Sequence, residues 1–425
     1  MPAWSEPVPP ESVVDHVLPG TDLIVPLAAG EPVGLLDAVE AAAGQLEGVR
    51  VHQMHALTER GYLDGRYGER LRHVSYFLSP VTRAHFHTGG IDFVPAHFSE
   101  VPLLLRHNCQ QPLILAAASP PDAHGYFSLG TNADYVASFV GRWPIFLEAN
   151  ERMPRTFGRN TVHVSQVLGW SLTDRELPEV PPVEPDDLDH AIAALIAERV
   201  PDRATIQAGI GSIPNAVLAA LAEHRDLGIH TELLSDGVID LIESGVATGV
   251  YKRRRPNQSV ATFSLGTRRL YDFLHENPAV QFLPVEWVND PRVIAQQPLM
   301  VSINATTEVD LLGQAASETI GGRYYSGSGG QADFARGAMF SEGGQGFLVT
   351  RSTTSDGATS KIVPRLTRGS VVTTLKNTVD KVVTEWGVAE LRGRSLRQRA
   401  CNLIEVAHPD YRDQLGREAR HLGYL

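Results

Sequence analysis

Cysteine is scarce in this chain of 425 residues, which holds only Cys109 and Cys401. Two cysteines are too few for the disulfide framework of a small secreted protein, so we expect reduced thiols in a cytoplasmic protein. Because no neighbouring motif would activate either thiol, we interpret both residues as small buried apolar side chains.

Long hydrophobic runs are missing as well. No stretch of about 18 or more apolar residues occurs, which predicts that no helix crosses a membrane. The opening residues, MPAWSEPVPPESVVDHVLPG, contain neither the basic segment nor the apolar segment of a secretory signal. We therefore expect a cytoplasmic protein that does not bind a membrane.

Positive charge is in deficit, because 37 Lys and Arg residues face 49 Asp and Glu residues, for a formal net charge of −12. This balance argues against nucleic-acid binding, although a local basic patch can still bind a small anion. The hydrophobic content of 43% and the charged content of 20% are typical of globular proteins. The length allows two or three domains.

Segments with the patterns of strands and of helices alternate along the chain, which predicts an α/β fold. The expected strands are residues 22–27, 49–54, 113–116, 162–167, 259–265, 280–287, 299–304, 371–375 and 381–384. The expected helices are residues 35–46, 190–200, 267–276 and 396–405. Residues 176–189 hold four prolines and six acidic residues, which predicts a connection between two domains, 1–185 and 186–425.

The most informative stretch is residues 204–245, which has the pattern of strand, glycine turn, helix, strand and helix. A short apolar run ends at the turn Gly209-Ile210-Gly211, Ser212 is placed to cap the next helix, and Pro214 fits its first turn. In a parallel sheet, ligands bind beyond the carboxyl ends of the strands. The N–H groups of the glycine turn and the carboxylate of Glu232 are both expected at those ends.

Several stretches in the last ~225 residues form a recognisable set. They are the turn at 209–211 with NAVL (215–218), HTELLSDGVIDLIESGVATG (230–249), NPAVQF (277–282), VNDP (288–291), VSINATTEVDLLGQ (301–314), YSGSGGQADFARGA (325–338), VVTEWGVAELRGRS (382–395) and AHPDYRDQL (407–415). PDAHGYFSLG (121–130) and EANERMP (148–154) match more loosely. Together they resemble the acetyl-CoA hydrolase/transferase family of class I CoA-transferases, which includes 4-hydroxybutyrate and acetate CoA-transferases.

The resemblance implies two tandem CoA-transferase-type α/β domains with largely parallel sheets, with the catalytic glutamate in residues 186–425. It implies a homodimer, and CoA as a substrate rather than a permanently bound cofactor. It also implies that CoA moves between an acyl-CoA and a free carboxylate through a glutamyl-CoA thioester. The family's nucleophile lies in a Thr-Glu or Ser-Glu pair before a helix, which corresponds to Glu232. Trp386 departs from the family, which usually has tyrosine there, and this difference could alter the size of the pocket.

The implied chemistry is covalent catalysis. A free glutamate has a pKa of about 4.3, so Glu232 is expected to be ionised and nucleophilic at neutral pH without a base. Each step passes through an oxyanion, and the backbone N–H groups of Ile210 and Gly329 are the expected donors to it. Three other glutamates on or near the matching stretches are alternatives: Glu308, Glu318 and Glu385.

Further residues are expected to hold the ligands. Contacts with CoA are assigned to glycines of the two turns and to two basic residues: Gly209, Gly211, Gly327, Gly330, Arg351 and Lys361. Asn304 is expected to bind the substrate carboxylate or the nucleophile, although a structural role for a buried asparagine explains it nearly as well. Glu385 is expected to orient the site or to contact CoA. The basic run 252–255 is a further phosphate candidate, but such runs are more often solvated surfaces.

No metal site is expected. His85, His87 and His97 resemble a metal cluster, with the first two on one face if their segment is a strand, but no Cys or Asp partner lies at ligand spacing. Histidines of a pocket or of the core explain them better. The turn at 209–211 lacks the third glycine of a dinucleotide-binding motif and the Gly-Lys-Ser/Thr ending of a P-loop, so NAD and ATP are not expected.

Two alternative functions stay open. An acyl-CoA hydrolase on the same scaffold would let water intercept the covalent intermediate, and dependence of turnover on added acetate would separate it from a transferase. A non-catalytic acyl-CoA-binding subunit is the other alternative, and the presence of Glu232 and both glycine turns counts against it.

Overall fold

A computed structural model describes residues 6–425 of the chain. Residues 1–5 lie outside the described residues. They are the start of the N-terminal stretch that was compared with a secretory signal. The chain divides into two compact units, Met1–Val180 with Val260–Val288, and Pro181–Ser259 with Asn289–Leu425. The first division, between Val180 and Pro181, lies inside the proline-rich stretch 176–189.

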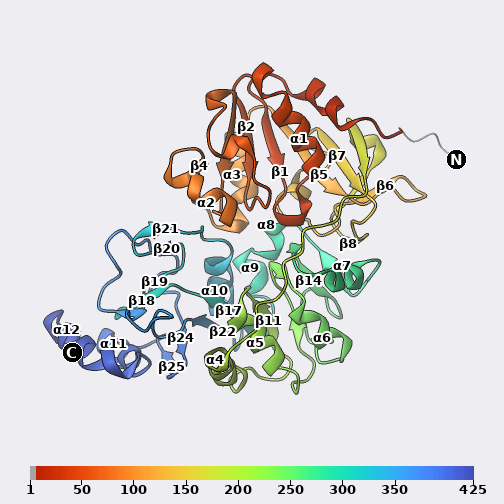
Figure 1. Ribbon diagram of the computed structural model, residues 1–425. Coiled ribbons are helices and arrows are strands. Elements are labelled where there is room, and N and C mark those ends of the chain that lie inside the picture. The colour runs from red at the N-terminus through yellow and green to blue at the C-terminus, as the bar shows by residue number, and fades with distance from the viewer. Residues whose placement is uncertain (1–5) are drawn as a thin grey trace. The chain divides into compact units, whose positions relative to one another are not determined.

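The first unit is built on a seven-stranded sheet in which every pair of neighbours is parallel, in the order β10-β7-β5-β1-β2-β3-β4. Figure 1 shows β1, β2, β5 and β7 of this sheet. The strands are β1 (Asp22–Val25), β2 (Val49–Gln53), β3 (Leu71–Ser75), β4 (Asp92–Phe93), β5 (Pro112–Ala118), β7 (Ile145–Asn150) and β10 (Gly169–Thr173). β5 is an almost continuous run of buried apolar residues, as expected for a strand covered on both faces.

Helices and short strands complete the first unit. The helices are α1 (Val33–Ala41), α2 (Pro80–His87), α3 (Val101–Asn108), α7 (Arg268–Leu274) and α8 (Val285–Val288). The short strands are β6 (Tyr126–Ser128), β8 (Phe157–Gly158), β9 (Thr161–His163), β15 (Phe263–Ser264) and β16 (Val280–Phe282), and β14 (Ser259–Ala261) enters the unit at its second residue. β16 pairs in parallel with β8, which ties residues 260–288 to the unit formed by the first 180 residues.

The second unit contains a six-stranded sheet in the order β12-β11-β17-β22-β24-β25. Its strands are β12 (Gly228–Ile229), β11 (Thr205–Ala208), β17 (Met300–Ala305), β22 (Gln345–Val349), β24 (Lys381–Thr384) and β25 (Gly387–Glu390). The first five strands run parallel, and only β25 is antiparallel to its neighbour. The expectation of an α/β fold with largely parallel sheets is therefore confirmed in both units.

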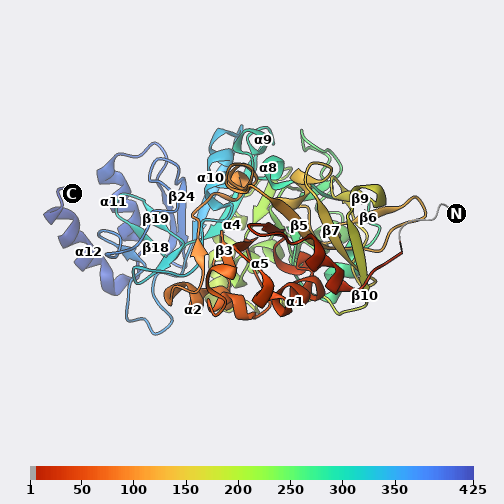
Figure 2. The same cartoon turned by 90° about the horizontal axis from the view of Figure 1, so that it is seen from above.

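The helices of the second unit are α4 (Asp187–Ala197), α5 (Ser212–Ala220), α6 (Gly237–Glu243), α9 (Pro291–Ile294), α10 (Gln331–Phe340), α11 (Leu396–Glu405) and α12 (Pro409–His421). Its short strands are β13 (Leu233–Leu234), β18 (Glu308–Asp310), β19 (Ala315–Ala316), β20 (Thr319–Ile320), β21 (Arg323–Tyr324) and β23 (Ile362–Val363). In Figure 2, α11 and α12 lie together beside the C-terminus, and their apolar faces share a core with β18 and β24. No helix formed by residues 6–425 has both the length and the apolar character that a membrane crossing requires.

Several expected elements are wrong in detail. The stretch 280–287 is not one strand, because β16 ends at Phe282 and Pro284 precedes α8. The stretch 371–375 makes only the isolated bridge between Thr374 and Ala315, and the stretch 162–167 leaves β9 for a short 3₁₀ turn. Ser212 is the first residue of α5 rather than its cap, whereas Pro214 lies in the first turn as expected.

Gly158 tests the pairing that brings residues 260–288 into the first unit. Its φ is +139°, and a Cβ there would overlap the carbonyl oxygen of Phe282 in the paired strand. We expect Gly158→Ala to lower the free energy of unfolding by roughly 3 kcal/mol in urea denaturation, because backbone cannot move aside as a side chain can. Gly44→Ala is the matched control, since a Cβ there meets no atom within 4 Å. Equal stability of the two variants would contradict the pairing.

Candidate active site

Five residues selected from the sequence lie at one edge of the second unit's sheet. Gly209 follows β11, Glu232 follows β12, Asn304 is the fifth residue of β17, Arg351 follows β22 and Glu385 follows β24. Since these strands are parallel, their carboxyl ends share an edge. Residues separated by up to about 175 positions in the chain are thus gathered at one edge of a single sheet.

Two donors hold the carboxylate of Glu232. The Nδ2 of Asn289 donates a hydrogen bond to its Oε2 at 2.8 Å, and the backbone N–H of Gly330 donates another. Gly330 is the N-cap of α10, so the carboxylate lies at the positive end of a ten-residue helix. A Cβ at Gly330 would overlap Oε2 of Glu232 and Nδ2 of Asn289, which explains why this approach requires glycine.

The surroundings of Glu232 change its ionisation. Burial raises the pKa of Glu232 to about 7, and the hydrogen bonds from Asn289 and Gly330 offset part of that rise. Burial thus shifts Glu232 towards its neutral form relative to the free side chain on which the expectation of an ionised glutamate was based.

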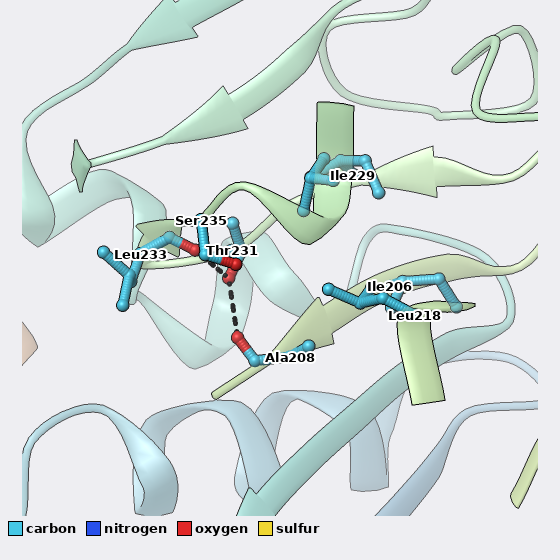
Figure 3. A pocket seen from close by; sticks show the side chains of 8 residues that line it. Ile206, Ala208, Leu218, Ile229, Thr231, Leu233 and Ser235 are labelled. Carbon is cyan, nitrogen blue, oxygen red and sulfur yellow. Dashed lines mark hydrogen bonds between the residues drawn. The ribbon is translucent and has the colours of Figure 1, made fainter. Parts of the chain in front are cut away.

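The bend that presents Glu232 is fixed by the residue before it. Thr231 is buried, and its hydroxyl donates to the carbonyl of Leu233 at 3.0 Å and to that of Ala208 at 3.4 Å (Figure 3). These bonds tie the bend to the end of β11 and to β13. The small cavity beside Thr231 is lined mainly by apolar residues of β11, β12 and the helices that follow them, and has room for about one water molecule. It is too small to be an acyl pocket.

The first glycine turn is only partly available to a ligand. The N–H of Gly209 donates to the carbonyl of Ile303 at 3.0 Å, so this expected CoA contact is already part of the sheet. Gly211, at φ +118°, is the N-cap of α5 and has a conformation that favours glycine. The side chain of Ile210 between them is 62% exposed.

The second glycine turn, residues 327–330, leads directly into α10. Gly329 has φ +54°, which turns the chain so that the next residue faces Glu232. The N–H that reaches the carboxylate is that of Gly330. Gly329, expected from the sequence as a donor to the oxyanion, is the residue before it, and that role stays a prediction.

Two asparagines near the site make different contacts. Asn304 and Gln207 bond each other through both amides, at 3.1 and 3.0 Å, which is the structural role considered for Asn304. Its contact with a ligand stays a prediction. Asn289, which sequence reasoning missed, is fully buried and contacts Glu232. Its Oδ1 has no hydrogen-bond partner among the described residues. The signal that could have identified it is VNDP, one of the stretches that carry the resemblance.

Glu385 is held by Ser352, whose N–H and hydroxyl donate to its two oxygens at 2.9 and 2.5 Å. The indole Nε1 of Trp386 donates to the same hydroxyl at 3.1 Å. Lys361 is partly buried, and burial together with the charge of Arg351 lowers its pKa. Its backbone N–H donates to the carbonyl of Ser352, so it is a neighbour of this group.

Arg351, expected to contact CoA, is already paired. Its guanidinium lies 2.9 Å from a carboxylate oxygen of Asp186 and 2.8 Å from one of Asp189 at the start of α4. A CoA phosphate would have to compete with two carboxylates for it.

The basic run 252–255 is not a solvated surface throughout, because Lys252 is buried and its Nζ donates to the carbonyls of Ile229 and Gln258, both at 2.6 Å.

The histidine group selected from the sequence is not arranged as a strand would arrange it. His85 and His87 belong to α2, where residues two apart point in different directions. His85 lies instead 3.5 Å from the carboxylate of Glu59.

A different cluster of potential metal ligands lies in the first unit. Asp22, His52 and Cys109 place one ligand atom each within 4.8 Å of one another, and all three are buried. His52 uses one ring nitrogen with Asp22 and the other with Tyr76, at 3.1 and 2.9 Å, while burial raises the pKa of the Cys109 thiol to about 12. Cys109 is buried as expected, whereas Cys401 is only partly buried. The neighbours of Cys109 could not be read from the sequence, because Asp22 and His52 belong to strands distant from it in the chain.

Comparison with known proteins identifies the family. Residues 6–182 match the acetyl-CoA hydrolase/transferase N-terminal domain, and residues 266–419 match the C-terminal domain. The chain belongs to the acetyl-CoA hydrolase/transferase family. The resemblance inferred from the sequence is thereby confirmed.

Relatives within this family are named CoA transferases. The chain is 44% identical to a succinyl-CoA:cyclohexane-1-carboxylate CoA transferase of Geobacter metallireducens, over 96% of this chain and 93% of the relative. It is 39% identical to a 4-hydroxybutyrate coenzyme A transferase of Clostridium kluyveri, over 96% of each chain. The crystal structure of RipA from Yersinia pestis superposes with a TM-score of 0.92 at 36% identity, over 98% of each chain.

These relatives make the chain an enzyme of the CoA-transferase type. An acetyl-CoA hydrolase of Yarrowia lipolytica is also similar, with 33% identity over 54% of this chain and 45% of that protein. The matches to the Geobacter and Clostridium transferases are longer and higher in identity.

Gly330→Ala tests the close approach at Glu232. We expect CoA-transfer activity to fall at least 100-fold while the melting temperature changes little, because the added Cβ meets the movable ends of Glu232 and Asn289 rather than backbone. Gly416→Ala in the middle of α12 is the matched control and should retain full activity, since its Cβ meets nothing closer than 3.9 Å. An active Gly330→Ala enzyme would contradict the arrangement.

Proposed function

We propose that this enzyme moves CoA between an acyl-CoA and a free carboxylate, with Glu232 as the covalent nucleophile. The observation that carries the proposal is the carboxylate of Glu232, held between Asn289 and the N–H of Gly330 at the carboxyl edge of a parallel sheet. Its raised pKa supports the same role, because perturbed carboxylates gather at catalytic sites.

The proposed reaction begins with the ionised form of Glu232. Its carboxylate oxygen attacks the thioester carbonyl, CoA leaves as a thiolate, and an acyl-glutamyl anhydride forms. The thiolate then attacks the glutamyl carbonyl, which releases the first carboxylic acid as its anion and leaves CoA bound to Glu232 as a thioester. An acceptor carboxylate repeats the two steps in reverse and leaves with CoA, which restores Glu232.

Backbone and amide donors supply the electrostatic part of this mechanism. The N–H of Gly330 already addresses a carboxylate oxygen, so it is placed to stabilise the oxyanion that forms when the glutamyl carbonyl is attacked. The dipole of α10 adds to this effect. The side-chain amide of Asn289 is the second donor, and it keeps Glu232 in one orientation. Ile210 and Gly329 remain proposed donors to the carbonyl of the bound acyl thioester.

The remaining ligand contacts are proposed as follows. Lys361, which is partly buried, is the candidate for a CoA phosphate, and Gly211 and Gly327 are the candidates for contact with the rest of CoA. Glu385, bonded to Ser352 and next to Trp386, is proposed to orient the site. We further propose that residues 186–425 form the CoA-transferase domain that carries the nucleophile, that residues 1–185 form its N-terminal counterpart, and that the enzyme is a cytoplasmic homodimer.

Covalent trapping tests the nucleophile. Incubation with acetyl-CoA or butyryl-CoA should add the mass of CoA to the intact protein, and borohydride should then reduce Glu232 to its alcohol, as located by peptide mapping. Glu232→Ala should show no adduct and no turnover. Glu308→Ala is the matched control, because Glu308 is bonded to Thr367 and should leave the adduct unchanged. An adduct on another residue would refute the assignment.

Dependence on an acceptor carboxylate distinguishes a transferase from a hydrolase, the activity named for the Yarrowia relative. Loss of acyl-CoA should depend on added acetate or another carboxylate, and each thioester consumed should appear as a new acyl-CoA. Release of free CoA that does not depend on an added carboxylate would instead show hydrolysis through the same intermediate. Binding of several acyl-CoAs with no adduct and no turnover would favour a non-catalytic subunit.

The pH dependence follows from the pKa of Glu232. Only the carboxylate attacks, so kcat/KM should rise about tenfold per pH unit on the acid side and level off above about pH 8. Asn289→Ala removes a donor that lowers this pKa, so its acid limb should move upward by about one pH unit. A limb that stays in place would mean that Glu232 is not the group that titrates.

A further inference from the structure

We propose that Glu318 is a positioning residue, which holds the loop 325–330 so that the N–H of Gly330 faces Glu232. The inference rests on the proposed function of Glu232. Glu318 was an alternative nucleophile on sequence grounds, because it lies close to a matching stretch. Its contacts in the structure give it a different task.

Glu318 bonds the start and the middle of this loop. It is 5% exposed, and its Oε1 accepts hydrogen bonds from the hydroxyl of Ser328 at 3.1 Å and from that of Thr373 at 3.0 Å. Its backbone carbonyl accepts from the N–H groups of Tyr325 at 2.7 Å and Ser326 at 3.1 Å. One residue thus fixes where the loop begins and where its middle lies.

The neighbouring Ser317 secures the same loop from the other side. Its hydroxyl accepts from the side-chain amide of Gln331, the first residue of α10, at 2.9 Å, and its carbonyl accepts from the hydroxyl of Ser326 at 3.3 Å. The loop between these points reads Ser-Gly-Ser-Gly-Gly and has no large side chain to anchor it in a core. Its position therefore depends on hydrogen bonds, and the two bonds to Oε1 join its middle to Thr373 on a separate segment.

The consequence for catalysis is geometric. Ser328 is two residues before Gly330, with Gly329 at φ +54° between them, so a shift of Ser328 displaces the N–H of Gly330. Displacement of a donor by about 1 Å can lower a rate about 100-fold. Glu318 touches neither Glu232 nor Asn289 in the structure's hydrogen-bond network, so it acts through the loop.

Three variants test this role. Glu318→Ala should lower kcat between tenfold and 100-fold with little change in KM, and should move the acid limb of the pH profile upward, because the N–H of Gly330 is one of the donors that lower the pKa of Glu232. Glu318→Gln keeps an oxygen acceptor for Ser328 and Thr373 and should restore kcat to within about threefold of wild type. Glu308→Ala is the matched control, because it removes a comparable pair of bonds, from the N–H and hydroxyl of Thr367, on β18.

The outcomes are distinct. If Glu318→Ala lowers only the melting temperature while its kcat and acid limb match those of Glu308→Ala, the positioning role is wrong. It is also wrong if Glu318→Gln is as impaired as Glu318→Ala. Should Glu318→Ala not fold, Ser328→Ala removes one of the same bonds and should show a smaller change in the same direction. Failure of the proposed function would appear separately, as undiminished turnover in Glu232→Ala.

Discussion

The contact on which the site depends is the approach of one backbone N–H to one partly desolvated carboxylate. Burial by itself would keep Glu232 protonated at neutral pH, and a protonated acid is a poor nucleophile. The hydrogen bonds from Asn289 and Gly330 lower this pKa again, and the net value is about 7. A carboxylate with few donors in a water-poor site is less stabilised, and hence more reactive, than one in solvent. The geometry of Gly330 and Asn289 therefore sets how far the pKa of Glu232 rises.

That contact is possible because a parallel sheet collects the ends of its strands. The chain returns to the same edge after each crossover, so Glu232 after β12 and Glu385 after β24 share an edge. The sheet provides the common edge, and the loops supply the chemistry. Loop 325–330 has the most demanding position, because it must pass close to a charged side chain without a side chain of its own at Gly330. Small residues there allow the approach, and bonds from outside the loop replace the packing that large residues would have provided.

The sequence predicted the features that follow from local pattern. The strands near 22, 49, 113, 299 and 381, the helix Leu396–Glu405 and the glycine turn before α10 were expected close to where they lie. The choice of Glu232 needed the resemblance, because a glutamate after a short strand is by itself uninformative. What the sequence could not provide were properties of the folded surroundings. The pKa of Glu232, the pairing of Asn304 with Gln207 and the engagement of Arg351 by Asp186 all depend on residues distant in the chain. Asn289 was missed for the same reason, since it meets Glu232 across 57 positions.

The return of residues 260–288 to the first unit bears on how this protein can be made and divided. A ribosome synthesises the chain from its N-terminus, so β8 waits for its partner β16 until well over 100 further residues have been added. The first unit therefore cannot complete its folding as a nascent chain of 180 residues, even though most of its sheet is already present. A gene cut at the proline-rich stretch would separate the two family domains in sequence. The first unit would then lack residues 260–288, and the second unit would carry them without their partner strand. An excisable first half would have to be designed as a fusion of 6–180 with 260–288, joined by a new linker.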